Sequence, residues 1–371
     1  MKPKPQIVSP QDSLHRVHTY FKGSPYHPDG RRVLCSRFES IEGEGEVCLL
    51  DRETGEEEVL GGSNCLTYHN GASPYFCDGG RKVIWRETHD TVAVLDLHTG
   101  EKTALDGNIC LYSGVLDKHF IQMDEGWPLE EQNRMGIWLR SIDGKEKTLL
   151  ADVDKMLENS PRGGAVRSGR ILLRLGGEIS PDQKTVILFL VANAGTLVRD
   201  YYTCDFRGEG MEFHGNLGTH IMWHPDSRRI YSYARPWSTP LGDLREHFGP
   251  DGWRLGKGLL ARYDTATREM EVVSDYPIPG GCHVSPSPDG TRAVLDCLPK
   301  NIVKILLWDE TRGEMRELCE LPRALPREPM KEGRMAKHYD MNPHPAFSLD
   351  GGRILFNSCT DGTVRLYEME V

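Results

Sequence analysis

Short apolar runs separated by tight turns recur along the whole chain. Each repeat opens with a turn of the Pro-Asp-Gly type and continues with runs rich in valine, isoleucine and leucine, which are typical of strands. Successive turn aspartates are between 39 residues (Asp78 to Asp117) and 65 residues (Asp117 to Asp182) apart, which suits four-stranded propeller blades with insertions. We therefore predict an all-β fold, a seven-bladed β-propeller in which residues 1–371 form a single domain. The seven turns lie at residues 27–30, 77–80, 116–119, 180–183, 224–227, 287–290 and 348–351.

A second turn, of the Asp-x-x-Thr-Gly-Glu type, closes the repeats but occurs only six times. After the seventh turn of the first type the chain contains two more apolar runs and ends one strand short of a blade. We expect residues near Pro5 to Ser9 to supply the missing outer strand and so close the last blade, which would remove the free edges of the ring. The six copies begin at Asp51, Asp96, Ile142, Asp205, Asp264 and Asp309.

Residues 124–135, 236–257 and 321–341 do not follow the repeat. Long loops on rigid scaffolds commonly form binding surfaces. We therefore expect these three segments to contribute to a ligand-binding face.

Composition narrows the class of partner. With 38% hydrophobic and 27% charged residues the chain is typical of a globular protein, and its net charge of −10 argues against a nucleic-acid partner. No run approaches the ~20 apolar residues of a membrane-spanning helix, and the start of the chain has no signal-peptide pattern, so we expect a cytoplasmic protein without a membrane partner. The ten cysteines are scattered without a Cys-x-x-Cys motif, which favours reduced, buried thiols.

Three histidines share one place in the repeat. His220, His283 and His344 each lie six residues before a turn aspartate, so equivalent positions in the last three repeats carry an imidazole. At the entry of the innermost strands, these side chains would ring one mouth of the central channel. Three neutral imidazoles suit Mn, Fe, Zn, Ni or Cu and could form an open metal site. Alternatively, each histidine makes hydrogen bonds within its own blade.

Three further residues are candidate substrate contacts. His18 and His69 precede the inner strands of the first two blades and could reach the same mouth, or could be ordinary loop histidines. Arg199 could bind a carboxylate, or could form a surface ion pair. The chain contains no phosphate-binding loop, dinucleotide fingerprint or Gly-x-Ser-x-Gly motif, which excludes nucleotide-binding and serine-hydrolase interpretations based on those motifs.

Three segments carry a resemblance to a known family. HTYF at residues 18–21, GCHVSPSPDG at 281–290 and NPHPAFSLDGGRILFNS at 342–358 resemble the oligogalacturonate lyases, which are seven-bladed propellers. The resemblance implies a Mn ion held by histidines and a glutamine at the channel mouth. It also implies that His283 and His344 match two of the family's metal ligands.

The resemblance breaks at several positions of the implied site. The first histidine of the family's His-Pro-His-Pro motif is Asn342 here, and the family's glutamine falls at Tyr339, next to His338. His338 or Asn342 could complete the metal shell, with His220 as a further ligand or a catalytic contact to the substrate and Tyr339 as a substrate contact.

The family's catalytic histidine falls in the stretch Ser-Tyr-Ala-Arg-Pro, where Tyr233 takes its place. Elimination from a 4-linked uronide requires neutralisation of the C6 carboxylate, removal of the C5 proton and protonation of the departing O4. A metal or an arginine can do the first, and Tyr233 could act as base if Arg235 lowers its pKa. Alternatively, Tyr233 is a packed strand aromatic and Arg235 forms a ladder salt bridge.

These features predict a carbon–oxygen lyase that cleaves short uronic-acid oligosaccharides by metal-assisted β-elimination, a reaction of pectin degradation. The partner would be an anionic oligosaccharide and the cofactor a divalent metal, Mn in first place. The alternatives are a non-catalytic propeller that binds sugar or protein, and a uronate-active glycoside hydrolase using the same pocket.

Overall fold

The computed structural model describes nine stretches of the chain, and their regular structure is almost entirely β. Helical structure is limited to short pieces, among them α1 (Val153–Glu158) and the 3-10 turn η1 (Asp78–Gly80). The inserted segments 125–134 and 236–257, and most of 321–341, lie outside the described residues. The described residues are 4–110, 114–124, 135–161, 163–164, 171–193, 197–235, 258–324, 326 and 341–371.

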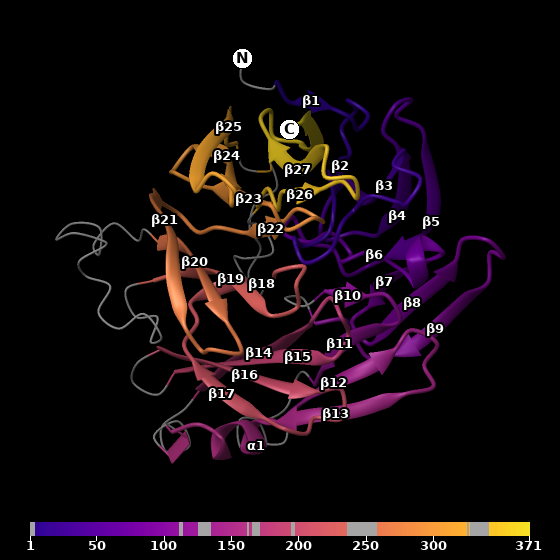
Figure 1. The fold of residues 1–371 in the computed structure, drawn as a ribbon. Coiled ribbons are helices and arrows are strands. Elements are labelled where there is room, and N and C mark those ends of the chain that lie inside the picture. Colours follow the sequence, from indigo (N-terminus) through magenta and orange to yellow (C-terminus); the bar gives the residue numbers. More distant parts are fainter. Residues whose placement is uncertain are drawn as a thin grey trace. The chain divides into compact units, whose positions relative to one another are not determined.

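The strands form seven antiparallel sheets of four strands each (Figure 1). The chain divides into two compact units, Met1–Asp106 with Ile278–Val371, and Gly107–Pro277. Each unit is described by itself, and the single domain over 1–371 stays a prediction. We number the sheets one to seven in the order of their innermost strands along the chain.

The first unit contains sheets one, two, six and seven. Sheet one consists of β2 (His15–Val17), β3 (Arg32–Phe38), β4 (Gly45–Asp51) and β5 (Glu57–Ser63). Sheet two consists of β6 (Tyr75–Cys77), β7 (Lys82–Thr88), β8 (Thr91–Asp96) and β9 (Lys102–Asp106). Sheet six consists of β22 (Val284–Pro286), β23 (Arg292–Cys297), β24 (Ile302–Asp309) and β25 (Glu314–Pro322). Sheet seven consists of β26 (Ala346–Phe347), β27 (Arg353–Cys359), β28 (Val364–Glu370) and β1 (Gln6–Ile7).

The second unit contains sheets three, four and five. Sheet three consists of β10 (Val115–Leu116), β11 (His119–Met123), β12 (Gly136–Ser141) and β13 (Lys147–Asp152). Sheet four consists of β14 (Ile171–Ile179), β15 (Thr185–Asn193), β16 (Leu197–Asp205) and β17 (Glu212–Gly215). Sheet five consists of β18 (Thr219–Trp223), β19 (Arg229–Ala234), β20 (Gly258–Asp264) and β21 (Met270–Ile278).

Burial explains why the sequence shows apolar runs for the second and third strands of a sheet. β27 is buried at six of its seven positions, because both faces of a middle strand are covered, whereas the outer strand β9 is exposed at four of five. Apolar clusters join successive sheets in the first unit: Val294 with Phe356, Cys35 with Leu355, and Leu34 with Trp85.

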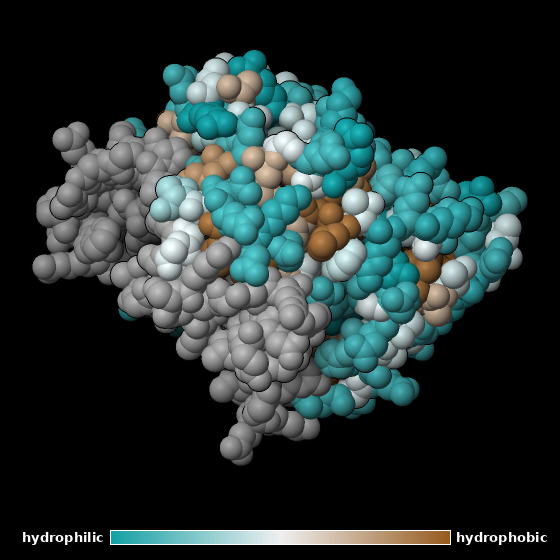
Figure 2. Space-filling view, turned by 90° about the horizontal axis from the view of Figure 1, so that it is seen from below, coloured by the Kyte–Doolittle hydropathy of each residue, from teal (hydrophilic) through white to brown (hydrophobic). Residues whose placement is uncertain are grey.

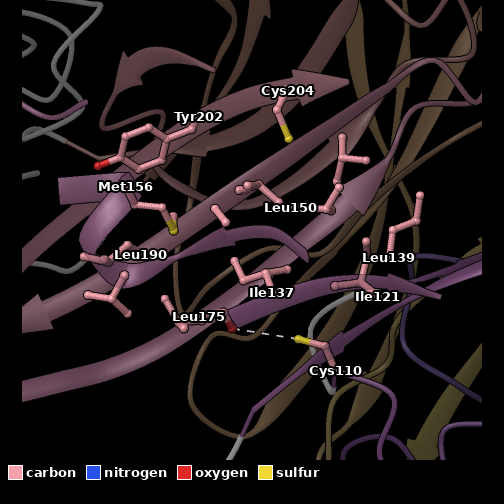
Figure 3. Close-up of a cluster of buried hydrophobic side chains, with 14 of the residues drawn as sticks. Cys110, Ile121, Ile137, Leu139, Leu150, Met156, Leu175, Leu190, Tyr202 and Cys204 are labelled. Carbon is pink, nitrogen blue, oxygen red and sulfur yellow. Dashed lines mark hydrogen bonds between the residues drawn. The ribbon is translucent and has the colours of Figure 1, made fainter. Parts of the chain in front are cut away.

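In the second unit, one apolar cluster joins sheets three and four with α1 (Figure 3). Ile121 and Leu139 come from sheet three, Leu175 and Leu190 from sheet four, and Met156 from the helix. The short helix therefore caps a core that two sheets already share.

The repeated aspartates stabilise the turns that the sequence predicted. In sheet seven, the Ser348 hydroxyl donates to the Asp350 carboxylate (2.6 Å) and accepts the Arg353 backbone N–H (2.9 Å). Gly351 follows with φ 71°, a left-handed conformation that glycine adopts without a steric penalty. Such side-chain bonds within a turn explain why aspartate, serine and glycine recur there.

The state of the cysteines and the apolar character of the described helices can be compared with what the composition predicts. All ten cysteines are buried and free, as predicted. Among the described residues, no helix has the length and apolar character needed to cross a bilayer. Polar and charged side chains cover most of the described surface in view in Figure 2. The cytoplasmic location and the absence of a nucleic-acid partner stay predictions.

The N-terminal segment closes sheet seven, as the missing turn predicted. Gln6 and Ile7 of β1 pair with Glu368 and Tyr367 of β28. The backbone N–H of Val8 donates to the carbonyl of Leu366 (3.0 Å). The edge of β28 is therefore covered by a strand from the other end of the chain.

Deletion of residues 1–10 should lower the melting temperature by several degrees. It removes a few backbone hydrogen bonds, each worth about 1 kcal/mol, and uncovers the edge of β28. Differential scanning calorimetry would measure the change, with a deletion of residues 1–4, which stops before β1, as the control. Equal melting temperatures for the two deletions would contradict this role of β1.

One position of the second strand links the sheets of the first unit. It is occupied by Ser36, Arg86, Asp296 and Asn357 in sheets one, two, six and seven. Each lies three residues beyond an equivalent cross-strand pair: Tyr26 with Val33, Phe76 with Val83, Pro286 with Ala293, and Phe347 with Ile354.

Three of these four side chains accept a backbone N–H from the next sheet. Ser36 accepts from Ala72 (2.8 Å). Asp296 accepts from His344 (3.3 Å), and Asn357 accepts from His18 (3.0 Å). We call these three bonds the sheet-to-sheet links. Through them, side chains of the second strands hold sheets six, seven, one and two together.

Candidate metal centre

Three buried imidazoles meet in the first unit. His69, His283 and His344 each offer one ring nitrogen, and these atoms all lie within 4.8 Å of one another. The ring centroid of His344 is 4.4 Å from that of His283 and 4.6 Å from that of His69. Three nitrogen donors at this separation fit one transition-metal ion. We call them the histidine cluster.

The segments that lead into inner strands carry the members of the histidine cluster. His283 directly precedes β22, His344 lies two residues before β26, and His69 belongs to the loop between β5 and β6. His344 has φ 47° and His220 has φ 52°, a left-handed backbone that is uncommon outside glycine. The shared backbone conformation agrees with the equivalent places in the repeat that their equal offsets predicted.

A buried carboxylate orients two members of the cluster. Asp296 is fully buried, and its Oδ2 lies 2.8 Å from Nδ1 of His283. The same carboxylate accepts the backbone N–H of His283 (2.7 Å) and that of His344 (3.3 Å). An ionised carboxylate only accepts, so Nδ1 of His283 carries the proton and Nε2 keeps its lone pair for a metal. Asp296 thus contacts His283 in the same way that a carboxylate contacts many metal-bound histidines, at the ring nitrogen away from the metal.

The side-chain amide of Asn342 contacts His69, the third member of the histidine cluster. The Asn342 side chain lies 2.8 Å from Nδ1 of His69, and its backbone carbonyl accepts from the amide of Asn357 (3.3 Å). The atom nearest to Nδ1 is the amide nitrogen, which can only donate, so in this orientation Nδ1 accepts and the neutral ring carries its proton on Nε2. The opposite orientation of the amide would present its oxygen to Nδ1–H and leave Nε2 of His69 for a metal. The contact shows that Asn342 orients the His69 ring, and the candidacy of His69 as a ligand rests on its place in the histidine cluster. Direct ligation by Asn342 and a substrate contact by His69 stay predictions.

Two aromatic rings shield the cluster. The centroid of Tyr20 lies 4.8 Å from that of His344, 5.5 Å from that of His69 and 5.7 Å from that of His283. Phe21 lies 5.0 Å from His283. Both are almost completely buried, so they exclude water and lower the local dielectric constant around the imidazoles.

His18, from the same HTYF segment, is also buried but is not one of the clustered imidazoles. Its burial lowers the pKa of the ring to about 4, so the ring is neutral at physiological pH. Its backbone N–H donates to Asn357, which fixes the start of the segment that carries Tyr20 and Phe21. Its predicted contact with substrate stays a prediction.

The predicted base lies in the second unit with its cation. Tyr233 of β19 is fully buried, and the guanidinium carbon of Arg235 lies 4.6 Å from the centre of its ring. Arg199 of β16 donates to the carbonyl of Gly218 (3.4 Å), and His220 lies in β18. Convergence of these four side chains with the histidine cluster stays a prediction, and His338 and Tyr339 lie outside the described residues.

The fold is that of a seven-bladed β-propeller, with each sheet as one blade, as the repeats predicted. It is similar to the structure of an oligogalacturonate lyase in complex with manganese, with a TM-score of 0.65 and 14% identity, covering 100% of this chain and 97% of that one. An oligogalacturonate lyase from Vibrio parahaemolyticus gives a TM-score of 0.64 with the same identity and coverage. The resemblance seen in the sequence is thus matched in structure.

The fold is shared more widely. The β-propeller domain of Cps50 from Myceliophteria thermophila matches with a TM-score of 0.55 and 10% identity, covering 99% of this chain and 100% of that domain. No family model matches the sequence, and no curated protein matches it. At these identities the likeness shows the fold, and the function has to be argued from the site.

Proposed function

We propose that the histidine cluster holds one divalent metal ion, with Mn as the first candidate. The observation that carries this is the meeting of three buried imidazoles, one of them fixed by the Asp296 carboxylate. The donor set suits Mn, Fe, Zn, Ni or Cu, and the likeness to a manganese-bound propeller favours Mn.

We further propose that the protein is a lyase that cleaves short uronic-acid oligosaccharides by β-elimination. When bound, the metal would neutralise the C6 carboxylate and so acidify the C5 proton. Asp296 holds the ligands in place and the rings of Tyr20 and Phe21 keep water away. Tyr233, with Arg235 on its ring face, is the proposed base that removes the C5 proton. The C4–O4 bond then breaks as the C4=C5 double bond forms, and the protonated Tyr233 returns the proton to the departing O4.

A two-readout assay tests the reaction class. The protein, loaded with Mn, is incubated with oligogalacturonates and other oligouronides, and both ultraviolet absorbance and new reducing ends are followed. Absorbance of a 4,5-unsaturated uronide is expected, lost on chelation and restored by Mn. New reducing ends without this absorbance would indicate a hydrolase. If no oligouronide gives a product, the result would support the alternative of a non-catalytic propeller that binds sugar or protein.

Replacement of Asp296 by Asn should weaken metal binding roughly 10- to 100-fold, the usual effect of losing a second-shell carboxylate. Asn preserves the size and one acceptor oxygen, so the fold should survive. Titration with Mn, monitored by calorimetry, gives the dissociation constant. Asp309→Asn, at an exposed turn of the same sheet, is the control. Equal Mn affinities for the two variants would show that Asp296 does not contribute to metal binding.

A further inference from the structure

Arg86 breaks the pattern of the sheet-to-sheet links. At the equivalent position the other sheets of the first unit carry Ser36, Asp296 and Asn357, and each accepts a backbone N–H. A guanidinium has donors and no acceptor, so Arg86 cannot make this link. Sheet two therefore carries a cation where the other three carry an acceptor.

The Arg86 side chain is largely buried and has no counter-ion among the described residues. The residue is 5% exposed, its Nε has no hydrogen-bond partner, and no carboxylate among the described residues pairs with it. An arginine cannot shed its proton, and a buried charge without a partner destabilises a fold. The burial of this cation is explained if an anion from outside the chain binds to it and neutralises its charge.

A second polar group beside Arg86 is also unsatisfied. The backbone N–H of Arg86 donates to the carbonyl of Ala72 (3.0 Å), which places the next residue, Ser73, against the end of β7. The Ser73 hydroxyl is buried and has no hydrogen-bond partner in the described chain. A guanidinium and a hydroxyl can both donate, so the ligand they suit is an acceptor.

Ser73 lies on the loop that carries one member of the histidine cluster, and Arg86 is bonded to the same loop through Ala72. Ser73 belongs to the loop between β5 and β6 that carries His69, and its backbone N–H donates to the carbonyl of Asn70 (2.9 Å). The same loop is closed by two backbone bonds between Thr67 and Gly71 (2.9 and 3.2 Å). The loop is thus a tight unit that carries an imidazole and an unsatisfied hydroxyl, and its Ala72 carbonyl accepts the backbone N–H of Arg86.

We propose that Arg86, assisted by Ser73, binds a carboxylate of the sugar ligand. This rests on the proposed function and names the group by which the site recognises its substrate, a uronate carboxylate. A planar guanidinium matches a carboxylate with two parallel hydrogen bonds, which an ammonium cannot reproduce. The site would therefore discriminate uronic acids from neutral sugars through Arg86.

The test is equilibrium binding of galacturonate, a monosaccharide with no glycosidic bond to eliminate, measured by calorimetry on the metal-loaded protein. Galactose is the neutral probe. Arg86→Gln should weaken galacturonate binding by at least roughly tenfold, the range of a charged bidentate contact, and Arg86→Lys should recover only part of it. Arg81→Gln, an exposed arginine beside the same strand, is the matched control and should bind as wild type.

Stability separates a binding role from a structural one. Because Arg86 is an unpaired buried cation, Arg86→Gln should keep or raise the melting temperature, and Mn stoichiometry should not change. A lower melting temperature in both Arg86 variants with unchanged galacturonate affinity would overturn the inference. So would equal binding of galacturonate and galactose, or no binding of galacturonate by wild type.

Failure of this inference differs from failure of the proposed function. If wild type forms unsaturated product and Arg86→Gln keeps the same KM, the lyase activity is supported and carboxylate binding by Arg86 is contradicted. If Arg86 proves necessary for galacturonate binding but no oligouronide gives unsaturated product, carboxylate recognition by Arg86 is supported and the elimination reaction is contradicted.

Discussion

Joint replacement of His283 and His344 by alanine is expected to abolish Mn binding and to reduce kcat/KM for oligouronides by roughly 10³-fold or more, about 4 kcal/mol of transition-state stabilisation. Two of the three clustered imidazoles are then lost, and a single histidine cannot hold the ion. Elemental analysis of purified protein and the ultraviolet assay are the measurements. Imidazole must be neutral to bind a metal, so the affinity of wild type for Mn should also fall as the solution is made more acidic.

The control removes two other histidines. His89 and His98 are both exposed, and their joint replacement by alanine should leave metal content and activity unchanged. Mn retained by the His283 and His344 variant at wild-type stoichiometry would show that the metal is held elsewhere. If wild type takes up no metal, even after incubation with Mn, the metal site is contradicted. The imidazoles would then be direct substrate contacts or acid and base groups.

The second large effect is a loss of stability in mild acid, caused by a buried histidine of the second unit. His214 lies between the Thr203 hydroxyl (2.7 Å) and the Tyr263 hydroxyl (2.8 Å), and burial lowers the pKa of its ring to about 4. Above pH 6.5 the ring is neutral in both folded and unfolded chains, so it has no effect on the free energy of unfolding. Below pH 6.5 the unfolded chain gains a proton that the fold excludes, and stability falls until about pH 4.

The expected loss is about 2 kcal/mol at pH 5 and about 3 kcal/mol at pH 4 from this residue alone. Urea denaturation of wild type and His214→Gln between pH 7 and pH 4 measures it. The variant should be less stable at pH 7, because a well-packed ring is lost, but should show a shallower decline with acid. Parallel curves for the two proteins would mean that His214 does not exclude the proton.

Counting turns was enough to predict how the last blade is built, because local signals fix it. Six second-type turns for seven repeats required an outer strand from elsewhere, and β1 provides it. His283 and His344 were found in the same way, since equal offsets from a turn mark equivalent places. These features depend on spacing along the chain, which the sequence displays directly.

The other parts of the site depend on contacts that spacing does not reveal. His69 lies in an irregular loop, and the equivalent place in its repeat holds Ser73, so no equal offset marked it. Asp296 meets His283 across two strands, thirteen residues apart in sequence. Its one sequence signal is a lone carboxylate within the apolar run RAVLDC. Tyr20 contacts the cluster through packing, which depends on the whole unit.

The sheet-to-sheet links bear on how the first unit unfolds. A linear repeat array can lose its terminal repeats one at a time, since each unit satisfies its own polar groups. Here Ser36, Asp296 and Asn357 each satisfy an N–H of the following sheet, and β1 returns the chain from its start to its end. Detaching one sheet would leave a buried donor without an acceptor in its neighbour. Cooperativity between the four sheets is therefore built into hydrogen bonding at the starts of their inner strands, beside the histidine cluster.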